Sequence, residues 1–282
     1  MNSFIMAHKR KKSESSGGAG PLIPDLVSLG ILTKPISEFS NSDIGTTVLI
    51  PYTDSSSKIL LNNGCIEFEV VGVNHHTSSE HSQTITLMTK NLIRYAAFDA
   101  KEPNNPDTKR QMYGNGCWGV SNIRQWLNSS GDANLWWSKQ HAYDAAPNAD
   151  NVPNTVGVYA DAPGFLKGFS HEVLEHLTDI TNITALYNVD GGGSETTTEK
   201  VFLPSYTEMG YGNINGIAEG SHLSVRFPND NSRIKSGAKY WMRSLSIDGA
   251  SGDGSYVSNS GSNNYNSACN GNVGIAPIIV LH

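Results

Sequence analysis

The chain has 282 residues, enough for one large domain or two small ones. Its formal net charge of -6 argues against a general nucleic-acid binder, which needs a broad cationic surface. No run of about 18 apolar residues occurs, so nothing in the sequence is expected to span a membrane. The 28 glycines, together with many asparagines, predict a fold rich in turns or strands, because these residues readily adopt positive φ angles.

Residues 1–43 are predicted to form a flexible or extended docking arm in front of the compact domain. The first 20 residues lack apolar spacing for packing, and their basic run, Lys9 to Lys12, is interpreted as a solvated tail rather than as a contact for nucleic acid or an acidic protein. Residues 21–40 are apolar but interrupted by prolines, which excludes one long helix. Such a segment is expected to dock into a groove on a partner or on its own domain. The expected docking residues are Leu22, Ile23, Leu26, Val27, Leu29, Ile31 and Leu32.

The compact domain is expected to begin near Ile44 and to continue to residue 282. Residues 46–52, 66–73 and 84–89 predict strands, because they are apolar or alternate between apolar and polar side chains. We expect the second and third of these strands to pair through the polar loop between them.

Residues 116–128, with the sequence GCWGVSNIRQWLN, predict the clearest helix of the chain. Ser121 is a good N-cap, and Ile123, Trp126 and Leu127 recur at helical spacing to form one apolar face. Residues 134–140 are expected to add a turn. Four tryptophans in this region are expected to pack in the core rather than to line a ligand site. They are Trp118, Trp126, Trp136 and Trp137.

Further along the chain, residues 169–178 predict a second short helix, and residues 190–198 predict an exposed loop rich in glycine and threonine. Residues 201–204 predict a buried strand. Ser205 and Glu208 follow it with the spacing of a capping box, in which each side chain bonds the main-chain N–H of the other residue.

Two apolar strands are predicted near the C-terminal end, at residues 239–244 and 274–281. The polar stretch between them, residues 247–273, interleaves tyrosine with asparagine, serine and glycine, a composition that binding loops favour. We expect an outward-facing loop, either binding a ligand or simply solvated. The candidate ligand-binding residues are Tyr256, Asn259, Asn263, Asn264, Tyr265 and Asn266.

Several segments follow one pattern in chain order: IEFEVVGV, GCWGVSNIRQWLN, VFLPSYTEM, and YWMRS with the closing GIAPIIVL. Together they resemble a domain family of uncharacterised function from Gram-positive bacteria and their phages. That family carries a tryptophan helix ending in WLN, an FLLS…E segment, a YWLRS strand and a closing GVRPAL. The resemblance covers residues 44–282. The chain keeps Arg243 but has Ala276 where the family usually has arginine, so any role of that arginine is lost.

The family is similar to the C-type-lectin-like fold of formylglycine-generating enzymes and phage tropism proteins. The resemblance implies an α+β domain whose first and last strands pair. It also implies a twisted antiparallel sheet with two flanking helices, and an irregular region that displays binding residues.

Three motifs come near to catalytic or metal chemistry. The sequence HEVLEH, residues 171–176, spaces its histidines by five rather than the four of a zinc-binding HExxH helix, so its charged pairs are expected to be surface contacts. Cys117 and Cys269 suggest the copper site of formylglycine-generating enzymes, but with Cys65 they are expected to be reduced, isolated thiols. Residues 248–255 resemble a calcium loop without the EF-hand spacing, and a plain turn is expected.

We therefore expect a non-enzymatic virion protein of a phage or prophage, without a cofactor or metal. The arm would attach it to a capsid or tail partner, as a capsid decoration, head fibre or tail adhesin. The domain would be displayed for decoration or for adhesion to a host cell-surface glycan or protein. A homo-oligomer is expected, made in the host cytoplasm and released by lysis, because the N-terminus lacks a secretory signal. The alternative is a metal-dependent lectin or a formylglycine-generating-type enzyme.

Overall fold

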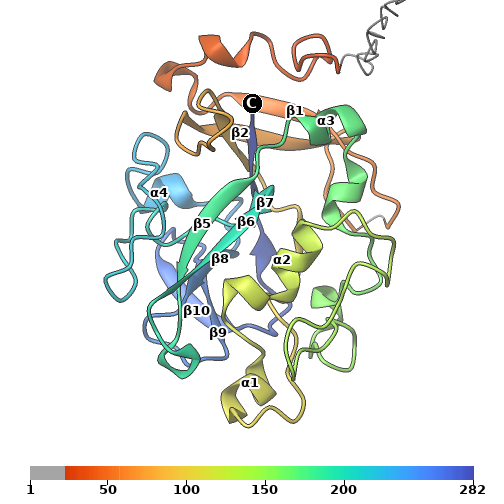
Figure 1. Cartoon of the computed structure of the whole chain (residues 1–282), viewed down its shortest axis with the longest axis vertical. Coiled ribbons are helices and arrows are strands. Elements are labelled where there is room, and N and C mark those ends of the chain that lie inside the picture. The colour runs from red at the N-terminus through yellow and green to blue at the C-terminus, as the bar shows by residue number, and fades with distance from the viewer. Residues whose placement is uncertain (1–22, 57) are drawn as a thin grey trace, which may run out of the picture.

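The computed structural model describes residues 23–56 and 58–282. The basic run Lys9 to Lys12 and the predicted docking residue Leu22 lie outside the described residues. The described part is an α+β structure of strands, short helices and long connecting loops (Figure 1). Among its helices, none has the length and apolar character that crossing a bilayer requires.

The first sheet has five strands, and every neighbouring pair in it is antiparallel. The order across this sheet is β1 (Thr47–Pro51), β2 (Cys65–Val73), β3 (Ile85–Thr89), β12 (Ile278–Leu281) and β7 (Val201–Phe202). The predicted pairing of β2 with β3 is confirmed. The first and last strands do not pair as expected, because β12 lies between β3 and β7 and leaves β1 at the edge.

The second sheet also has five strands. The order is β10 (Asn263–Ser267), β9 (Asp253–Val257), β8 (Tyr240–Leu245), β11 (Gly274–Ile275) and β4 (Arg94–Tyr95). Its neighbours are antiparallel except β8 and β11, which are parallel. The domain thus contains two five-stranded sheets rather than the single flanked sheet that the resemblance implies.

Residues 247–273 are not the outward loop that their composition predicts, because they contain the β9–β10 hairpin. Polar and small side chains conceal the strand pattern. Gly254 lies against the Trp241 ring, where a Cβ atom would come within 3.1 Å of the indole. The buried Ser255 hydroxyl donates to the Leu245 carbonyl at 2.7 Å. The hairpin therefore extends the sheet that contains β8.

The closing segment, residues 274–281, changes sheets at Ala276 and Pro277. Ile275 accepts a hydrogen bond from the main chain of Ile93 at 2.9 Å, while Pro277 accepts one from Thr89 at 3.0 Å. Proline has no N–H to continue a ladder, which favours a break at this point. Ala276, at the change of sheets, is fully buried. The segment predicted as one strand therefore joins the two sheets.

A separate two-stranded ribbon pairs β5 (Ile180–Ala185) with β6 (Ser194–Glu199) in antiparallel register. The prediction of a loop at residues 190–198 is therefore wrong for residues 194–198, which lie in β6. Side chains of β6 alternate between exposed and less exposed positions, and Glu199 at its end is buried. The β-branched threonines of this segment favour a strand, and cross-strand pairing decided between strand and loop.

The helices are short: α1 (Thr108–Tyr113), α2 (Asn122–Leu127), α3 (His171–Glu175) and α4 (Asp230–Arg233). The predicted cap of α2 is confirmed, since the Ser121 side chain accepts the main-chain N–H of Arg124. The buried apolar face of α2 is also confirmed. The helix is shorter than predicted, because residues 118–120 form a separate 3-10 turn. Residues 134–140 form no helix.

Three of the four tryptophans, Trp118, Trp126 and Trp136, are buried in the main hydrophobic core, and Trp137 packs against it. Trp136 stacks on Tyr159 with ring centroids 5.5 Å apart, and Trp126 meets the same tyrosine edge-on. The prediction that these indoles form a core seam is confirmed.

Residues 23–43 fold back onto the domain rather than extending from it. Leu26, Ile31 and Leu32 are buried in the main core, and Leu29 packs against it. Ile23 and Val27 are 42% and 38% exposed. The expected docking on its own domain is therefore confirmed for Leu26, Ile31 and Leu32, and the expectation of an extended arm is wrong there. Docking to a partner stays a prediction, and its exposed candidates are Ile23 and Val27.

Candidate functional site

Arg243 of the YWMRS segment lies on β8 and is fully buried. It forms an ion pair with Glu208, which is also fully buried. Two hydrogen bonds join the guanidinium to the carboxylate, at 2.7 and 2.8 Å, and His76 Nε2 lies 2.9 Å from the same carboxylate. Burial raises the pKa of Glu208, but Arg243 and then His76 outweigh it and hold that pKa below its ordinary value. We call these three residues the buried ion-pair centre.

The predicted capping box at Ser205 and Glu208 is confirmed. The main-chain N–H of Ser205 donates to the Glu208 carboxylate at 2.8 Å, and the Glu208 N–H donates to the Ser205 hydroxyl at 3.0 Å. That hydroxyl donates in turn to the Glu219 carbonyl at 2.7 Å. These groups satisfy one another, which indicates a structural role.

Asn128, the last residue of the WLN motif, holds the start of β7. Its side-chain oxygen accepts the N–H groups of Lys200 and Val201 at 3.1 and 3.0 Å. Its amide nitrogen donates to the carbonyls of Arg124 and Val201 at 3.1 and 2.8 Å. One side chain therefore fixes the end of α2 against the strand that follows the ribbon.

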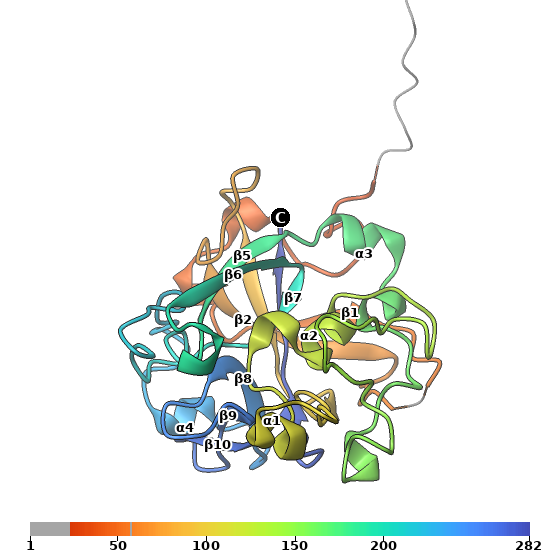
Figure 2. The ribbon, with the colours of Figure 1, turned by 60° about the horizontal axis from the view of Figure 1, so that its bottom comes forward.

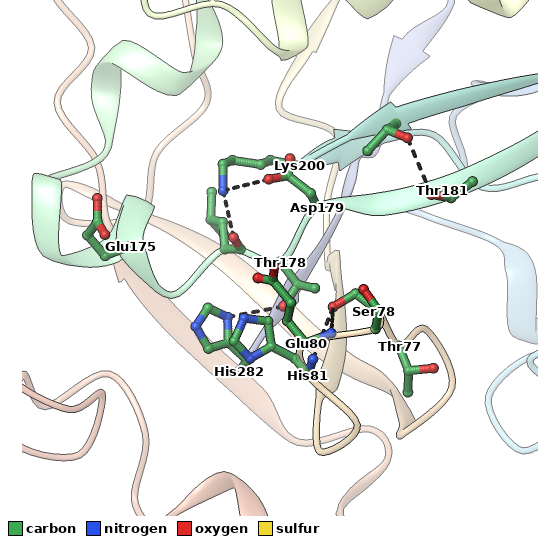
Figure 3. A pocket seen from close by; sticks show the side chains of 13 residues that line it. Thr77, Ser78, Glu80, His81, Glu175, Thr178, Asp179, Thr181, Lys200 and His282 are labelled. Atoms are coloured by element: carbon green, nitrogen blue, oxygen red, sulfur yellow. Dashed lines mark hydrogen bonds and ion pairs between the residues drawn. The ribbon is translucent and has the colours of Figure 1, made fainter.

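An open polar cavity of about 470 Å³ lies between the β2–β3 loop, the end of α3, the β5–β6 ribbon and the end of β12 (Figure 3). We call it the histidine groove. Hydroxyl, carboxylate, ammonium and imidazole groups line it. Its residues are Thr77, Ser78, Ser79, Glu80, His81, Glu175, Leu177, Thr178, Asp179, Thr181, Thr198, Lys200 and His282.

His81 and His282 stack in this groove, with ring centroids 3.4 Å apart and an interplanar angle of 17° (Figure 3). Burial, followed by electrostatic interactions with His81, His176 and Lys200, lowers the pKa of His282 to about 4. The His282 Nδ1 atom lies 3.2 Å from the Thr178 hydroxyl, which is 1% exposed. This hydroxyl orients the ring, and a neutral imidazole at pH 7 can exchange hydrogen bonds with a polar ligand.

Lys200 spans the upper part of the groove in Figure 3. Its ammonium donates to the Leu177 carbonyl at 2.8 Å and lies 3.4 Å from the Asp179 carboxylate. The Thr181 and Thr198 hydroxyls are paired across the ribbon at 3.3 Å. This groove could not be predicted from the sequence, because its residues come from segments far apart in the chain.

The two histidines of the HEVLEH motif have different surroundings. His171 and Glu175 make an exposed contact at 3.7 Å, the surface pair expected at this spacing, whereas His176 lies against the main-chain oxygens of Pro24 and His282. Across residues 23–56 and 58–282, no group of three or more histidine, cysteine, aspartate or glutamate side chains is placed to hold a metal ion. The Asp253 carboxylate in the calcium-like loop accepts the Ala250 N–H at 2.7 Å, as in an ordinary turn.

The cysteines have separate surroundings and form no disulfide. Cys117 donates to the Asp190 carboxylate at 3.2 Å, and Cys269 donates to the Met112 carbonyl at 3.8 Å. Burial raises the pKa of Cys269 to about 11, and burial together with Asp190 raises that of Cys117. Both thiols are protonated near neutrality, whereas metal binding and nucleophilic attack require the thiolate.

The predicted ligand-binding residues gather on the β9–β10 hairpin but differ in exposure. Tyr256 packs against Trp241 with ring centroids 6.3 Å apart, and the Asn266 side chain accepts from Asn270 at 3.0 Å. The remaining predicted residues are exposed, and we call them the hairpin face. They are Asn259, Asn263, Asn264 and Tyr265.

A cavity of about 540 Å³ begins where β10 ends. It includes Ser267, Cys269 and Asn270, together with residues of α1 and the loop at Asn154. Beside the cavity, Gly157 packs closely against Gly271, which lines it. A Cβ atom on Gly157 would lie 2.2 Å from the Gly271 Cα atom. The β9–β10 hairpin and α1, which border this cavity, lie at one end of the molecule, and residues 23–43 and the C-terminal end of β12, which borders the histidine groove, lie at the other (Figures 1 and 2).

The family model described as a domain of unknown function, DUF6273, matches residues 82–282. The chain belongs to this family. The DUF6273 region contains β3 to β12, and therefore the buried ion-pair partners Glu208 and Arg243, while β1 and β2 precede it. Neither the curated proteins nor the solved structures contain a match to this chain.

Proposed function

We propose that this DUF6273 protein is a non-enzymatic phage or prophage virion protein with a C-type-lectin-like domain. Its N-terminal segment anchors it to capsid or tail proteins, and the opposite end is displayed on the particle exterior as a homo-oligomer. The carrying observation is that residues 23–43 and the β9–β10 hairpin lie at opposite ends of the molecule (Figure 2). A protein anchored through one end presents the other to the medium.

The polar groups of the family motifs support this proposal. Arg243, Glu208 and Asn128 bond within the domain. They form a rigid frame, and binding residues are commonly carried on loops or strand ends that such a frame positions. The exposed tyrosine and asparagines of the hairpin face supply contact area and hydrogen bonds for a cell-surface glycan or protein.

Particle incorporation tests the anchor. Because Leu26, Ile31 and Leu32 are buried in the core, deletion of the whole segment would damage the fold. We instead expect the exposed double variant Ile23→Asp with Val27→Asp to fold normally and to be lost from purified particles. The matched control is Leu135→Asp, since this leucine is 75% exposed and lies outside the segment. Equal incorporation of both variants would overturn the anchor.

Binding of labelled protein to host cells and to a glycan array tests the displayed end. We expect Asn264→Ala with Tyr265→Ala to weaken binding at least tenfold. The control is Ile183→Ala with Thr196→Ala, a change of the same kind on the exposed face of the ribbon. If the hairpin variant binds as tightly as the wild type, the hairpin face is not the binding surface.

The alternative function, a metal-dependent lectin or a formylglycine-generating-type enzyme, makes a separate prediction. Purified protein would then contain stoichiometric calcium or copper by elemental analysis, and chelation would abolish the binding or the activity. The non-enzymatic proposal predicts less than about a tenth of an equivalent of either metal.

A further inference from the structure

His176, the residue that follows α3, has both ring nitrogens directed at main-chain oxygens. Its Nε2 atom lies 3.0 Å from the carbonyl oxygen of Pro24, and its Nδ1 atom lies 3.2 Å from the main-chain oxygen of His282. The side chain therefore bridges the N-terminal segment and the end of β12. These contacts are independent of the function proposed above.

The number of protons on this ring decides how many of these contacts are hydrogen bonds. Both partners are oxygen acceptors, and a main-chain carbonyl cannot donate. A neutral imidazole carries one N–H, whereas an imidazolium carries two. Only the protonated ring can therefore donate to Pro24 and His282 at once, and in the neutral ring one nitrogen lone pair faces an oxygen.

We propose that His176 is a proton-operated latch that holds residues 23–32 against the end of β12. The imidazolium makes both bonds and fastens the segment. When the ring loses a proton, one bond is lost and the segment opens more often. The pH of the surroundings thus sets how available the exposed Ile23 and Val27 are to a partner, a consequence that rests on the anchor proposed above.

The charged and titratable groups around the latch come from each element near it. Asp25 lies on the segment, Glu175 on α3, His81 on the β2–β3 loop and Lys200 after the ribbon, while His282 lies 5.8 Å from His176 between ring centroids. Asp25 and Glu175 are carboxylates, and Lys200 carries an ammonium group. His282 stays neutral at pH 5.5 because its pKa is lowered to about 4, so it adds no positive charge there.

Hydrogen exchange of the segment amides tests the latch in the full chain. The N–H groups of Leu29, Ile31 and Leu32 are hydrogen-bonded within the segment, to Asp25 and Leu26, and report its opening. After correction for intrinsic exchange, we expect their protection to be about tenfold higher at pH 5.5 than at pH 8, because a hydrogen bond from a charged donor is gained.

The variant His176→Gln can donate only through its amide and gains no proton, so its segment protection should not change between these pH values. His171→Gln is the control, since His171 is 74% exposed on the same helix, and it should keep the wild-type response. The latch is refuted if wild-type protection is the same at both pH values, or if His176→Gln responds as the wild type does.

A second measurement remains informative if the His176 variant does not fold. Nitrogen-15 NMR of the wild-type histidine rings should show His176 doubly protonated at pH 5.5, and its titration should coincide with the change in segment protection. Titration of His176 without a coincident change in the segment would overturn the proposal.

Discussion

The buried ion-pair centre and the histidine groove contain similar chemical groups but differ in their access to water. Arg243 and Glu208 side chains are each 1% exposed, whereas those of Lys200 and Asp179 are 32% and 60% exposed. In the buried ion-pair centre, the Arg243 charge is matched by that of Glu208, because an unpaired buried charge is costly. In the groove, water screens the charges and leaves them free to exchange partners. The first arrangement determines the fold, and the second is suited to binding.

The largest effect should follow from breaking the buried ion-pair centre. Glu208→Ala leaves the Arg243 guanidinium buried and unpaired, so we expect the free energy of unfolding to fall by about 3–5 kcal/mol. Urea denaturation followed by circular dichroism measures it. A loss below about 1 kcal/mol would mean that water reaches Arg243 and that the two regions do not differ as described.

A smaller loss is expected at Asn128, which joins α2 to β7 without a charge. Asn128→Ala removes all of its hydrogen bonds and leaves main-chain groups of Lys200 and Val201 without this partner, at a cost of about 2–3 kcal/mol. Thermal and urea unfolding would measure this loss. The matched comparison is Asn91→Ala, an exposed asparagine, which should change stability by less than about 0.5 kcal/mol.

The groove histidine should make stability depend on pH. Because the folded-state pKa of His282 is about 4 and its ordinary value is 6.5, the unfolded chain binds more protons between these pH values. This contribution to stability is therefore present above pH 6.5 and is lost as the pH falls towards 4. Comparing the unfolding free energy of wild type and His282→Asn over this range measures it, and parallel curves would contradict it.

The smallest effect is expected for the ion pair of Lys200 with Asp179 in the histidine groove. Lys200→Ala and Asp179→Ala should each change the unfolding free energy by less than about 1 kcal/mol, because both charges are exposed to water. A double-mutant cycle on these two residues measures their coupling. A coupling close to that of Arg243 with Glu208 would remove the distinction between the two regions.

The features predicted correctly are those decided by a few neighbouring residues. The N-cap at Ser121 and the capping box of Ser205 with Glu208 depend on residues three apart, and both are present. The strand pair β2–β3 depends on apolar patterning and a polar loop between its members. Local hydrogen bonding and periodicity were therefore enough for these elements.

The features predicted wrongly, or missed, depend on partners far away in the chain. The polar β9 and β10 segments become strands because β8 supplies a pairing edge and Trp241 a surface for Gly254 and Tyr256. The histidine groove brings His81 against His282 across most of the chain.

The sequence by itself determined the capped start of α2, the capping box at Ser205 and the paired strands β2 and β3, because capping and apolar periodicity are short-range properties. Only the tertiary structure decided that residues 274–281 join two sheets, that Leu26 and Leu32 are buried, and that Arg243 meets Glu208. Each of these three outcomes depends on which distant segment packs against the residues and excludes water from them. That choice is made when the elements pack together, not within any one of them.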